Sequence, residues 1–234
     1  MGSIDPKRNP TAAAAFWLRR DIIRGVFAPG ERLATEFLAS FYNIGYSPMR
    51  EAIVLLSSSD LTVHEHQRGR FVAPVSLRDW LDVEDTYLRT SKMALHLAIE
   101  RGDLAWEERM ILSLYRSLRS VSSAPPTDPE KLEVWHMSRR ALHAEMRAGA
   151  NSAVLSDFLS DLSDRLERYI YLFGDRSLEA NRDHHAQHRV FVDALLSRDP
   201  TRLVSVMEEY FDYGKPVRES VGRRLAAGMS EENS

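Results

Sequence analysis

The first part of the chain carries apolar residues at helical spacing. One stripe shares a single face of a helix predicted over residues 12–24, and its members are Ala15, Leu18, Ile22 and Ile23. Thr11 is expected to cap the start of this helix, and Gly25 to end it. The pattern predicts an amphipathic helix that buries one side.

A second, shorter apolar group predicts a helix over residues 35–42. Phe37, Leu38 and Phe41 are expected to supply its core side chains. Residues 43–46 then form a tight connector, in which Gly45 is expected to take a positive φ. Another helix follows directly after this connector.

The third helix has clear signals at its start. Ser47 is a good N-cap, Pro48 suits the first helical position, and Glu51 is favourable near the positive end of the helix dipole. Its apolar face consists of Met49, Ala52, Ile53 and Leu56. Arg50 is therefore expected to point outward. Two short helices joined by a tight turn that contains a glycine are typical of a helix-turn-helix motif.

The period changes from helical to alternating after residue 60. Residues 61–66 and 70–74 are predicted as two short strands around a turn, with Arg68, Gly69 and Arg70 at the tip. Three helices followed by a basic hairpin predict a winged helix-turn-helix domain over residues 11–75.

The rest of the chain has helical periodicity throughout. Helices are predicted over residues 76–101, 103–121, 129–149, 152–173, 176–198 and 200–226. We expect residues 76–228 to form an all-α antiparallel helical bundle. The fold class is therefore mainly α, with an N-terminal winged helix-turn-helix followed by this bundle.

Composition excludes several classes of protein. The chain has no cysteine, which excludes disulfides, thiolate metal sites and a cysteine nucleophile. No apolar run approaches the roughly 18 residues of a membrane span, so no membrane partner and a cytoplasmic location are expected. The polar residues 1–10 are expected to form a disordered leader. No Ser-His-Asp signature, P-loop or dinucleotide fingerprint occurs, so we assign no catalytic residues and no enzyme activity.

Charge is unevenly distributed along the chain. The net charge is -3 overall, but residues 1–74 carry 9 Lys or Arg against 7 Asp or Glu. This excess of +2 is small. DNA binding would therefore depend on the placement of the cations and on dimerisation, rather than on bulk charge.

Five short segments together resemble the GntR family of bacterial transcription regulators. They are Ile23-Arg24-Gly25, residues 28–33, Leu38-Ala39, residues 48–53 and residues 68–72. The resemblance implies that the protein binds a double-stranded DNA operator through Glu31, Arg32, Tyr46, Ser47, Pro48, Arg50, Glu51, Arg68, Gly69 and Arg70. The family usually has Ser-Arg where this chain has Gly45-Tyr46, which predicts lower affinity or an altered operator preference.

The second part of the chain looks like the ligand-sensing FCD domain of the FadR subfamily. The resemblance rests on Tyr87-Leu88-Arg89, Leu142-His143, Asn151 and residues 188–195. Many members hold a divalent metal with one Asp and three His. His143 and His188 match two of these ligands, whereas Arg139 stands at the Asp position and Tyr210 at the position of the last His.

Metal binding remains an open alternative on the residues alone. An arginine cannot ligate a cation and would repel one. His143 and His188 nevertheless remain candidate ligands for Zn or Ni, and His184 shares a helix face with His188, as His136 does with His143. Histidines at these spacings are more often hydrogen-bonded core or surface residues. The sequence therefore assigns no certain cofactor.

Arg139 also suggests a different kind of pocket. A guanidinium binds a carboxylate or phosphate in a bidentate manner, so it could replace the charge of a metal. The hypothesis is a metal-independent site for a small organic acid or acyl effector, lined by Arg89, Arg139, His143, His188 and Tyr210. The alternative is that Arg139 turns outward beside Arg140 as part of a solvated helix face.

These expectations combine into one functional hypothesis. The protein is predicted to be a ligand-responsive transcription regulator, a repressor that binds a palindromic operator as a homodimer and is released or modulated by a small anionic metabolite. The alternative is a helical small-molecule or metal-binding protein whose DNA-binding head has degenerated, as the small basic excess and Gly45-Tyr46 suggest.

Overall fold

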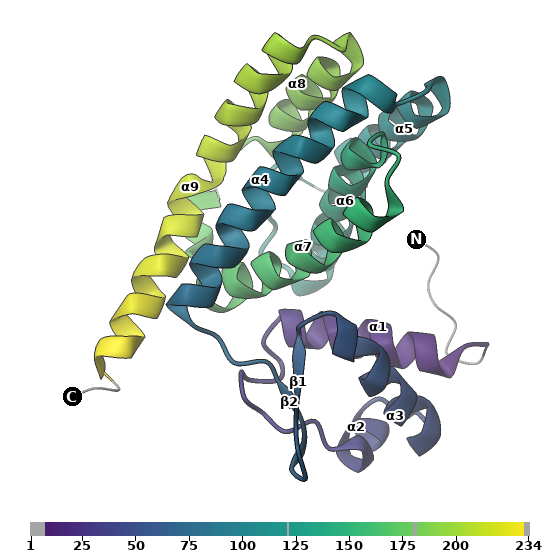
Figure 1. Cartoon of the computed structure of the whole chain (residues 1–234), viewed down its shortest axis with the longest axis vertical. Helices are drawn as coiled ribbons and strands as arrows, with labels where there is room; N and C mark the ends of the chain where they lie inside the picture. The colour runs from purple at the N-terminus through teal and green to yellow at the C-terminus, as the bar shows by residue number, and fades with distance from the viewer. Residues whose placement is uncertain (1–7, 121, 180–181, 232–234) are drawn as a thin grey trace. The chain divides into compact units, whose positions relative to one another are not determined.

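The computed structural model describes residues 8–120, 122–179 and 182–231, and most of them are α-helical (Figure 1). These residues fall into two compact units. The first contains the described residues up to Leu81 together with Ser163–Phe173, and the second contains Asp82–Leu162 and the described residues from Gly174 onward. The first seven residues of the expected N-terminal leader lie outside the described residues.

The first unit has the predicted order of elements. Three helices precede a hairpin, and a short 3-10 turn, η1 (Leu56–Ser58), lies before the first strand. The bounds are α1 (Pro10–Ile23), α2 (Thr35–Phe41), α3 (Tyr46–Leu55), β1 (Thr62–Glu65) and β2 (Gly69–Val72). The strands are antiparallel, with Glu65 opposite Gly69 at the turn. This arrangement confirms the winged helix-turn-helix.

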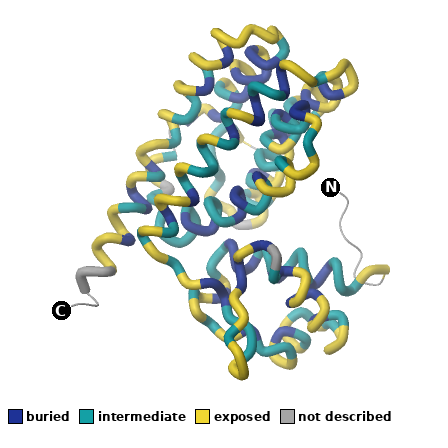
Figure 2. Tube along the Cα trace, viewed as in Figure 1, coloured by how far each residue is buried: buried dark blue, intermediate teal, exposed yellow. Residues whose placement is uncertain are grey.

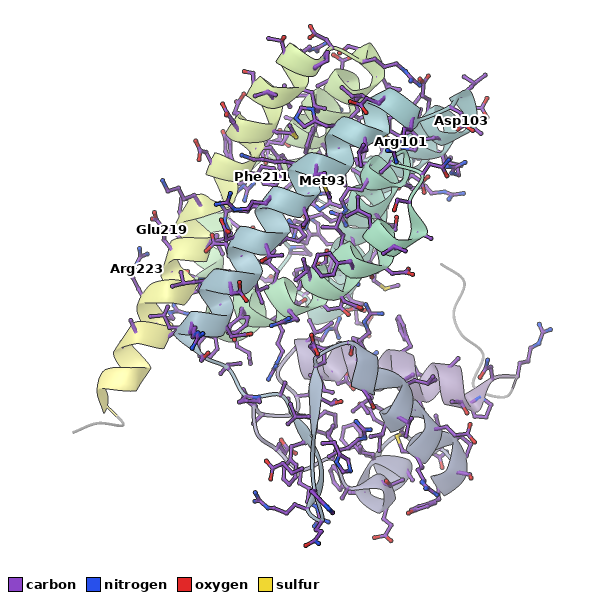
Figure 3. The ribbon with its side chains drawn as sticks, in the orientation of Figure 1. Met93, Arg101, Asp103, Phe211, Glu219 and Arg223 are labelled. Atoms are coloured by element: carbon purple, nitrogen blue, oxygen red, sulfur yellow. The ribbon has the colours of Figure 1, made fainter. Side chains whose placement is uncertain are left out.

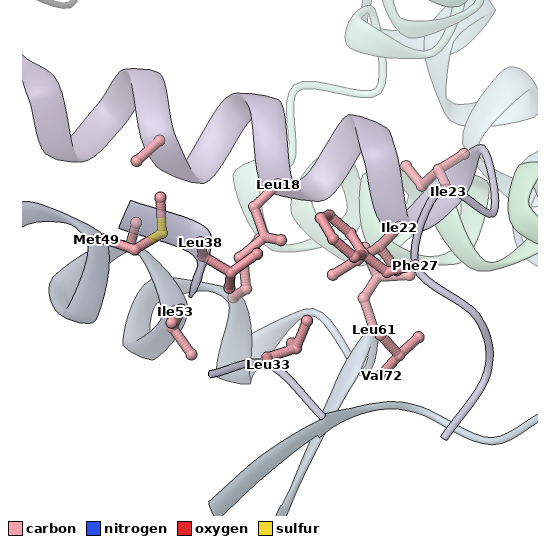
Figure 4. Close-up of a cluster of buried hydrophobic side chains, with 13 residues drawn as sticks. Leu18, Ile22, Ile23, Phe27, Leu33, Leu38, Met49, Ile53, Leu61 and Val72 are labelled. Carbon is pink, nitrogen blue, oxygen red and sulfur yellow. The ribbon is translucent and has the colours of Figure 1, made fainter. Parts of the chain in front are cut away.

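A single apolar core holds these elements together (Figure 4). Leu18 and Ile22 of α1 are fully buried, as are Leu38 of α2 and Met49 of α3. Val72 of the wing closes the same cluster. Burial of each such side chain contributes about 1.5–3 kcal/mol, so the core fixes α3 against α1 and leaves the opposite face of α3 exposed.

The helix starts differ from those predicted. α1 begins one residue before Thr11, because the Asn9 side chain accepts a hydrogen bond from the Ala12 N–H at 2.9 Å. α3 begins at Tyr46 with Gly45 as its N-cap and no side-chain cap, so Ser47 is not the cap. Pro48 is tolerated there because the first N–H groups of a helix have no partner within the helix.

The predicted core of α2 is only partly correct. Leu38 is buried, but Phe37 and Phe41 are 53% and 52% exposed. Their ring centroids lie 5.8 Å apart, so the two rings cover one another at the surface. In the connector that follows, Asn43 adopts the left-handed conformation with φ 50, and Gly45 has φ -59 rather than the positive φ expected.

Residues 163–173 of helix α7 (Ala153–Phe173) belong to the same unit as the winged helix. Asp164 forms an ion pair with Arg19 of α1, and Tyr171 packs against the apolar core. The Tyr169 ring packs against the Trp80 ring at an interplanar angle of 54°, with ring centroids 5.4 Å apart. This unit therefore includes chain segments from both halves of the sequence.

The second unit is the predicted helical bundle. Its remaining helical segments are α4 (Leu77–Arg101) from residue 82 onward, α5 (Leu104–Ser120), α6 (Pro129–Ala148), α8 (His184–Ser197) and α9 (Pro200–Glu231). The start predicted for the helix over 176–198 is wrong, because a short 3-10 turn, η2 (Arg176–Glu179), precedes α8. The Asp183 side chain caps α8 by accepting a hydrogen bond from the Ala186 N–H at 3.0 Å, which fixes the later start.

Helices α4 and α9 lie side by side in this unit, although they are far apart in sequence (Figure 3). Arg218 of α9 forms an ion pair with Glu84 of α4 at 2.7 Å. Figure 2 shows buried and exposed positions alternating around the helices, as their amphipathic sequences predict. Among the described residues, no helix is both long enough and apolar enough to span a membrane.

Candidate functional sites

The first candidate site is a groove of about 340 Å³ in the winged-helix unit. The start of α2, the exposed face of α3 and the wing line it. Five of the predicted DNA-binding residues meet here, namely Arg32, Tyr46, Arg50, Gly69 and Arg70. The fold therefore collects side chains that the sequence places on three separate elements.

The cations of this groove are available for a ligand. Arg50 is exposed, because its neighbours Met49 and Ile53 hold the opposite face of α3 in the core. Within the described part of the chain, Arg32, Arg50 and Arg70 have no carboxylate partner. Glu36 also lines the groove, so three guanidinium groups against one carboxylate leave a net positive charge that attracts a polyanion.

The wing presents its own cation at the tip. Gln67 and Gly69 take positive φ values of 62 and 103, which makes the tight turn. Arg68 is exposed beside this turn, where it pairs with Glu65 and lies 5.3 Å from the Phe71 ring centroid. The predicted turn is therefore present at the wing tip, and it carries an exposed arginine.

Both carboxylates among the predicted DNA-binding residues make contacts within the fold. The Glu31 carboxylate accepts a hydrogen bond from the Ala28 N–H at 2.7 Å, which closes the loop before α2. The Glu51 carboxylate accepts a hydrogen bond from the Thr11 hydroxyl at 3.0 Å, which ties α3 to α1. Ser47 and Pro48 lie in the first turn of α3.

His64 lines the same groove, although it is not among the DNA-binding residues predicted from the sequence. It lies opposite Arg70 in the register of the two strands. Residues paired directly across two strands project on the same face, so the strand alternation could have placed His64 beside Arg70.

The second candidate site is a polar cluster inside the helical bundle. The Tyr210 hydroxyl lies 2.6 Å from His143 Nε2 and 3.3 Å from His188 Nε2. The two imidazole Nε2 atoms are 3.2 Å apart. Residues from α6, α8 and α9 therefore meet at one point, as the resemblance implied for His143, His188 and Tyr210.

Burial keeps these histidines neutral. Desolvation, followed by the positive charge of Arg139, lowers the pKa of His188 to about 3 and holds the pKa of His143 well below its usual range. Desolvation raises the pKa of Tyr210 to about 12, so this residue keeps its hydroxyl proton. The Tyr210 hydroxyl can donate to one imidazole and accept from the other, which satisfies both Nε2 atoms without any cation.

Arg139 lies close enough to act on the whole cluster. Its charge contributes to the lowered pKa of His143, His184 and His188, and its guanidinium lies 5.3 Å from the Trp135 ring centroid. Arg139 is partly buried. Arg139 therefore does not belong to a fully solvated helix face, and its role in effector binding stays a prediction.

Neither Arg182 nor His184 is in the effector set predicted from the sequence. Arg182 is buried and donates hydrogen bonds to Gln187 at 3.0 Å and Glu179 at 3.4 Å. His184 is 1% exposed, and neither of its ring nitrogens has a hydrogen-bond partner among the described residues. Arg182 comes just before the N-cap of α8, so the predicted continuous helix over 176–198 concealed its position.

The prediction that Arg89 lines this pocket is wrong. Its side chain is 77% exposed and pairs with Asp85 at 2.7 Å, one turn earlier on α4. The i, i+4 pair holds the guanidinium along the outer face of the helix. A different basic residue, Arg147, lies beside the cluster, where it lines a small cavity together with His143 and Tyr210.

This cavity has a volume of only about 20 Å³, which is room for about one water molecule. Its lining includes Ser91, whose buried hydroxyl has no partner among the described residues, and Tyr87, which accepts a hydrogen bond from Arg147 at 3.2 Å. A larger ligand entering here would have to displace side chains.

The cluster does not fit the metal site implied by the FCD resemblance. His143 and His188 supply two imidazoles, but the carboxylate is replaced by Arg139 and the third imidazole by a protonated phenol. Across the described residues, no group of three His, Cys, Asp or Glu side chains is placed to hold a metal ion. Arg139 and Arg182 add positive charge that opposes a bound cation.

Comparisons with known protein families agree with the two units. Residues 11–72 match the family of bacterial regulatory proteins named gntR, and residues 92–213 match the FCD domain. The second match covers more than half of the chain and spans most of the helical bundle.

Individual relatives support the same assignment. The HTH-type transcriptional repressor GlaR of Escherichia coli K12 is 33% identical over 197 residues, which cover 83% of this chain and 89% of that protein. The HTH-type transcriptional regulator BphR of Paraburkholderia xenovorans LB400 is 33% identical over 196 residues, which cover 83% of this chain and 79% of that protein.

Solved structures share the fold at low sequence identity. E. coli McbR/YncC has a TM-score of 0.65 at 17% identity, with 96% of this chain and 98% of that chain covered. A transcriptional regulator from Rhodococcus sp. RHA1 has a TM-score of 0.61 at 17% identity, with 93% and 98% covered. With both domains matched in order, the chain belongs to the GntR family of bacterial regulatory proteins, in the branch that carries a C-terminal FCD domain.

Proposed function

We propose that this GntR-family regulator is a repressor that binds operator DNA through the groove between α3 and the wing. The observation that carries the proposal is the meeting of Arg32, Arg50 and Arg70 in one groove without carboxylate partners among the described residues. The exposed N-terminal part of α3 would enter the major groove, and Arg68 at the wing tip would contact the backbone or the minor groove. The name of the relative GlaR, a transcriptional repressor, supports repression.

The DNA-binding proposal is tested by selecting bound sequences from a random duplex library with the purified protein. The salt dependence of affinity is then measured for the selected duplex. Arg50→Ala should weaken binding and reduce the salt slope by about 1 if its guanidinium contacts one phosphate. Arg189→Ala is the matched control, because it removes an equally exposed cation from α8. Failure to enrich any sequence at low salt would instead support a degenerate DNA-binding head.

The effector of this regulator is proposed to be a small organic acid that binds the cluster in the bundle without a metal and displaces the side chains around the cavity of about 20 Å³. Arg139 and Arg182 supply positive charge beside His143, His188 and Tyr210, and the neutral imidazoles and the phenol supply hydrogen-bonding groups. A guanidinium recognises a carboxylate through two parallel hydrogen bonds. Binding would shift the operator affinity by a coupling free energy that is typically about 1–3 kcal/mol.

The effector proposal is tested by thermal shift with a panel of small carboxylic acids, and then by operator binding with each acid that stabilises the protein. Arg139→Ala should abolish the stabilisation, whereas Arg140→Ala, the adjacent cation that bonds Ser160, should retain it. An unchanged response in Arg139→Ala would overturn the pocket role. A response that requires added Zn or Ni would overturn the metal-independent site.

A homodimer on a palindromic operator completes the proposal. One winged helix makes few phosphate contacts, and a twofold dimer doubles them. Helix α5 offers a surface for a second copy of the chain, because Leu104, Ile111, Leu112 and Tyr115 on it are between 46% and 69% exposed. The opposite face of α5 is covered, with Trp106 and Met110 in the core of the bundle.

Charges on α5 favour an antiparallel pairing of two copies. Glu108 and Arg116 are both exposed and lie four residues on either side of Leu112. A twofold axis at Leu112 would place Glu108 of one protomer opposite Arg116 of its partner, and this contact would occur twice. Isologous apolar contacts flanked by opposite charges are typical of such an interface.

A further inference from the structure

A second cavity, of about 260 Å³, lies in the winged-helix unit at the base of the wing. Its walls come from the wing strands, the segment that leads into α4, and residues 163–173 of α7. The polar side chains that matter here are Asp60, Asp79, Arg165, Arg168 and Tyr169. This cavity is distinct from the DNA-binding groove and from the polar cluster in the bundle.

Arg168 is the unusual residue of this cavity. It is only 4% exposed, and its guanidinium donates a hydrogen bond to the carbonyl of Ala73 at the end of the wing. Among the described residues, its buried Nε–H has no partner and no carboxylate forms an ion pair with it. A buried charge without a counter-charge is strongly unfavourable, so native proteins almost always pair it.

The carboxylates nearby are already engaged by other groups. One oxygen of Asp79 pairs with Arg165, and the other accepts a hydrogen bond from the Tyr169 hydroxyl at 2.7 Å. Asp60 also pairs with Arg165, at 3.4 Å. Within the described part of the chain, these contacts leave Arg168 without an ion pair of its own, and Asp79 offsets its charge only through space.

We propose that this cavity binds a small oxyanion, a phosphate or carboxylate, with Arg168 as its principal ligand. The cavity is large enough for a compact anion, and a guanidinium matches the planar pair of oxygens that phosphates and carboxylates present. Because Arg168 also bonds the last residues of the wing, the bound anion would lie where the wing meets α7. The site is therefore separate from the effector pocket proposed for the bundle.

Inorganic phosphate is the probe for this site, used with the full-length protein at constant ionic strength. Unfolding by urea is measured at increasing phosphate concentrations. The chloride concentration is lowered in step, so that the ionic strength stays constant. In the wild type the folding equilibrium constant should rise in a saturable way, about elevenfold at a phosphate concentration ten times the dissociation constant.

The matched variant is Arg168→Met, which keeps most of the side-chain volume and removes the charge. It should lose the saturable response and retain only the gradual stabilisation that phosphate gives to any protein by exclusion from its surface. Without phosphate it should be at least as stable as the wild type, because an unpaired buried charge has been removed. An identical phosphate response in the wild type and Arg168→Met would overturn the proposal.

Should Arg168→Met fail to fold, titration calorimetry of the wild type gives an independent answer. Phosphate should bind with one site per chain, and sulfate should compete with it, since both are oxyanions of similar size. Arg189→Ala, which removes an exposed cation from α8, should bind phosphate equally well. Absence of measurable heat and of competition by sulfate would overturn the proposal.

Discussion

Trp106 is packed so closely against two glycines that neither glycine has space for a side chain. Its indole N–H donates to the carbonyl of Glu145 at 2.9 Å, and the ring is buried between Gly102 and Gly149. A Cβ built on Gly149 would lie 2.6 Å from the Trp106 ring. Gly149 has helical backbone angles, so the absence of a side chain at this position is required for packing and not for conformation.

Gly149→Ala should therefore destabilise the protein by about 1–3 kcal/mol, the usual cost of overpacking a core. Urea unfolding measures this change. The control is Gly228→Ala on α9, where an added Cβ meets nothing within 4 Å. That substitution should be neutral or stabilising by up to about 1 kcal/mol, because alanine is the better helix former. Equal effects of the two substitutions would contradict the packing argument.

Burial of the histidines makes the free energy of unfolding depend on pH. Desolvation lowers the pKa of His184 to about 2 and that of His188 to about 3, from the ordinary value of 6.5. Between pH 6.5 and 3 the unfolded chain therefore binds protons that the folded chain does not. The free energy of unfolding should fall as the pH falls through this range, by at most about 1.4 kcal/mol per pH unit for each histidine.

Urea unfolding at a series of pH values from neutral to mildly acidic tests this dependence. His184→Phe removes one titrating group from the cluster and should make the decline with falling pH less steep. His64→Phe is the control, because it replaces an exposed histidine that lies outside the cluster. A decline as steep in His184→Phe as in the wild type would contradict the role of burial.

At the level of elements, the start of α3 determines which side chains reach the DNA. Because the helix begins at Tyr46 rather than after Ser47, the Tyr46 side chain is the first of the helix and lines the groove, where it is 54% exposed. The GntR resemblance places an arginine at this position. An arginine side chain at position 46 would therefore be exposed in the groove, where this chain has the uncharged Tyr46.

Tyr46→Arg should tighten operator binding and increase the magnitude of the salt slope by about 0.9 per added phosphate contact. Fluorescence anisotropy at several salt concentrations measures both quantities. Phe37→Arg adds the same charge to the same unit at an exposed site outside the groove, so it should have a much smaller effect. Equal gains from the two substitutions would show that only net charge matters.

Elements with a long apolar stripe, such as α5 and α7, are predictable from the sequence. Their ends are harder to locate, because a cap depends on one side-chain hydrogen bond: Asn9 begins α1, and Asp183 begins α8. The site residues show the same limit. His143, His188 and Tyr210 follow from the family spacing, whereas the prediction for Arg89 fails because its partner Asp85 holds it on the outer face of α4.

At the level of the molecule, the two units are each built from more than one part of the chain. Residues 153–162 of α7 belong to the bundle and residues 163–173 to the winged-helix unit. Neither hydrophobic periodicity nor the family boundaries at residues 72 and 92 reveal this division. It depends on the ion pair of Arg19 with Asp164 and on other contacts between residues distant in sequence, which a local pattern does not encode.

The proposed pairing of two copies through α5 can be tested by reversing charges on that helix. If two copies pair through α5, Glu108→Arg places an arginine opposite Arg116 at both symmetric contacts and should raise the dimer dissociation constant about tenfold or more. The double variant Glu108→Arg with Arg116→Glu exchanges the two charges and should restore the dimer. Sedimentation equilibrium measures both changes.

Charge reversal at a site away from α5 is the control. Asp85→Arg alters the net charge by the same amount on the outer face of α4 and should leave the dissociation constant unchanged. A dimer that tolerates Glu108→Arg as well as it tolerates Asp85→Arg does not use the α5 surface. Recovery of the dimer in the double variant would be the decisive result. The double variant has the same net charge as the wild type, because the glutamate and the arginine have only exchanged places. Loss of the dimer in Glu108→Arg and its recovery in the double variant therefore require that residues 108 and 116 face each other across the interface.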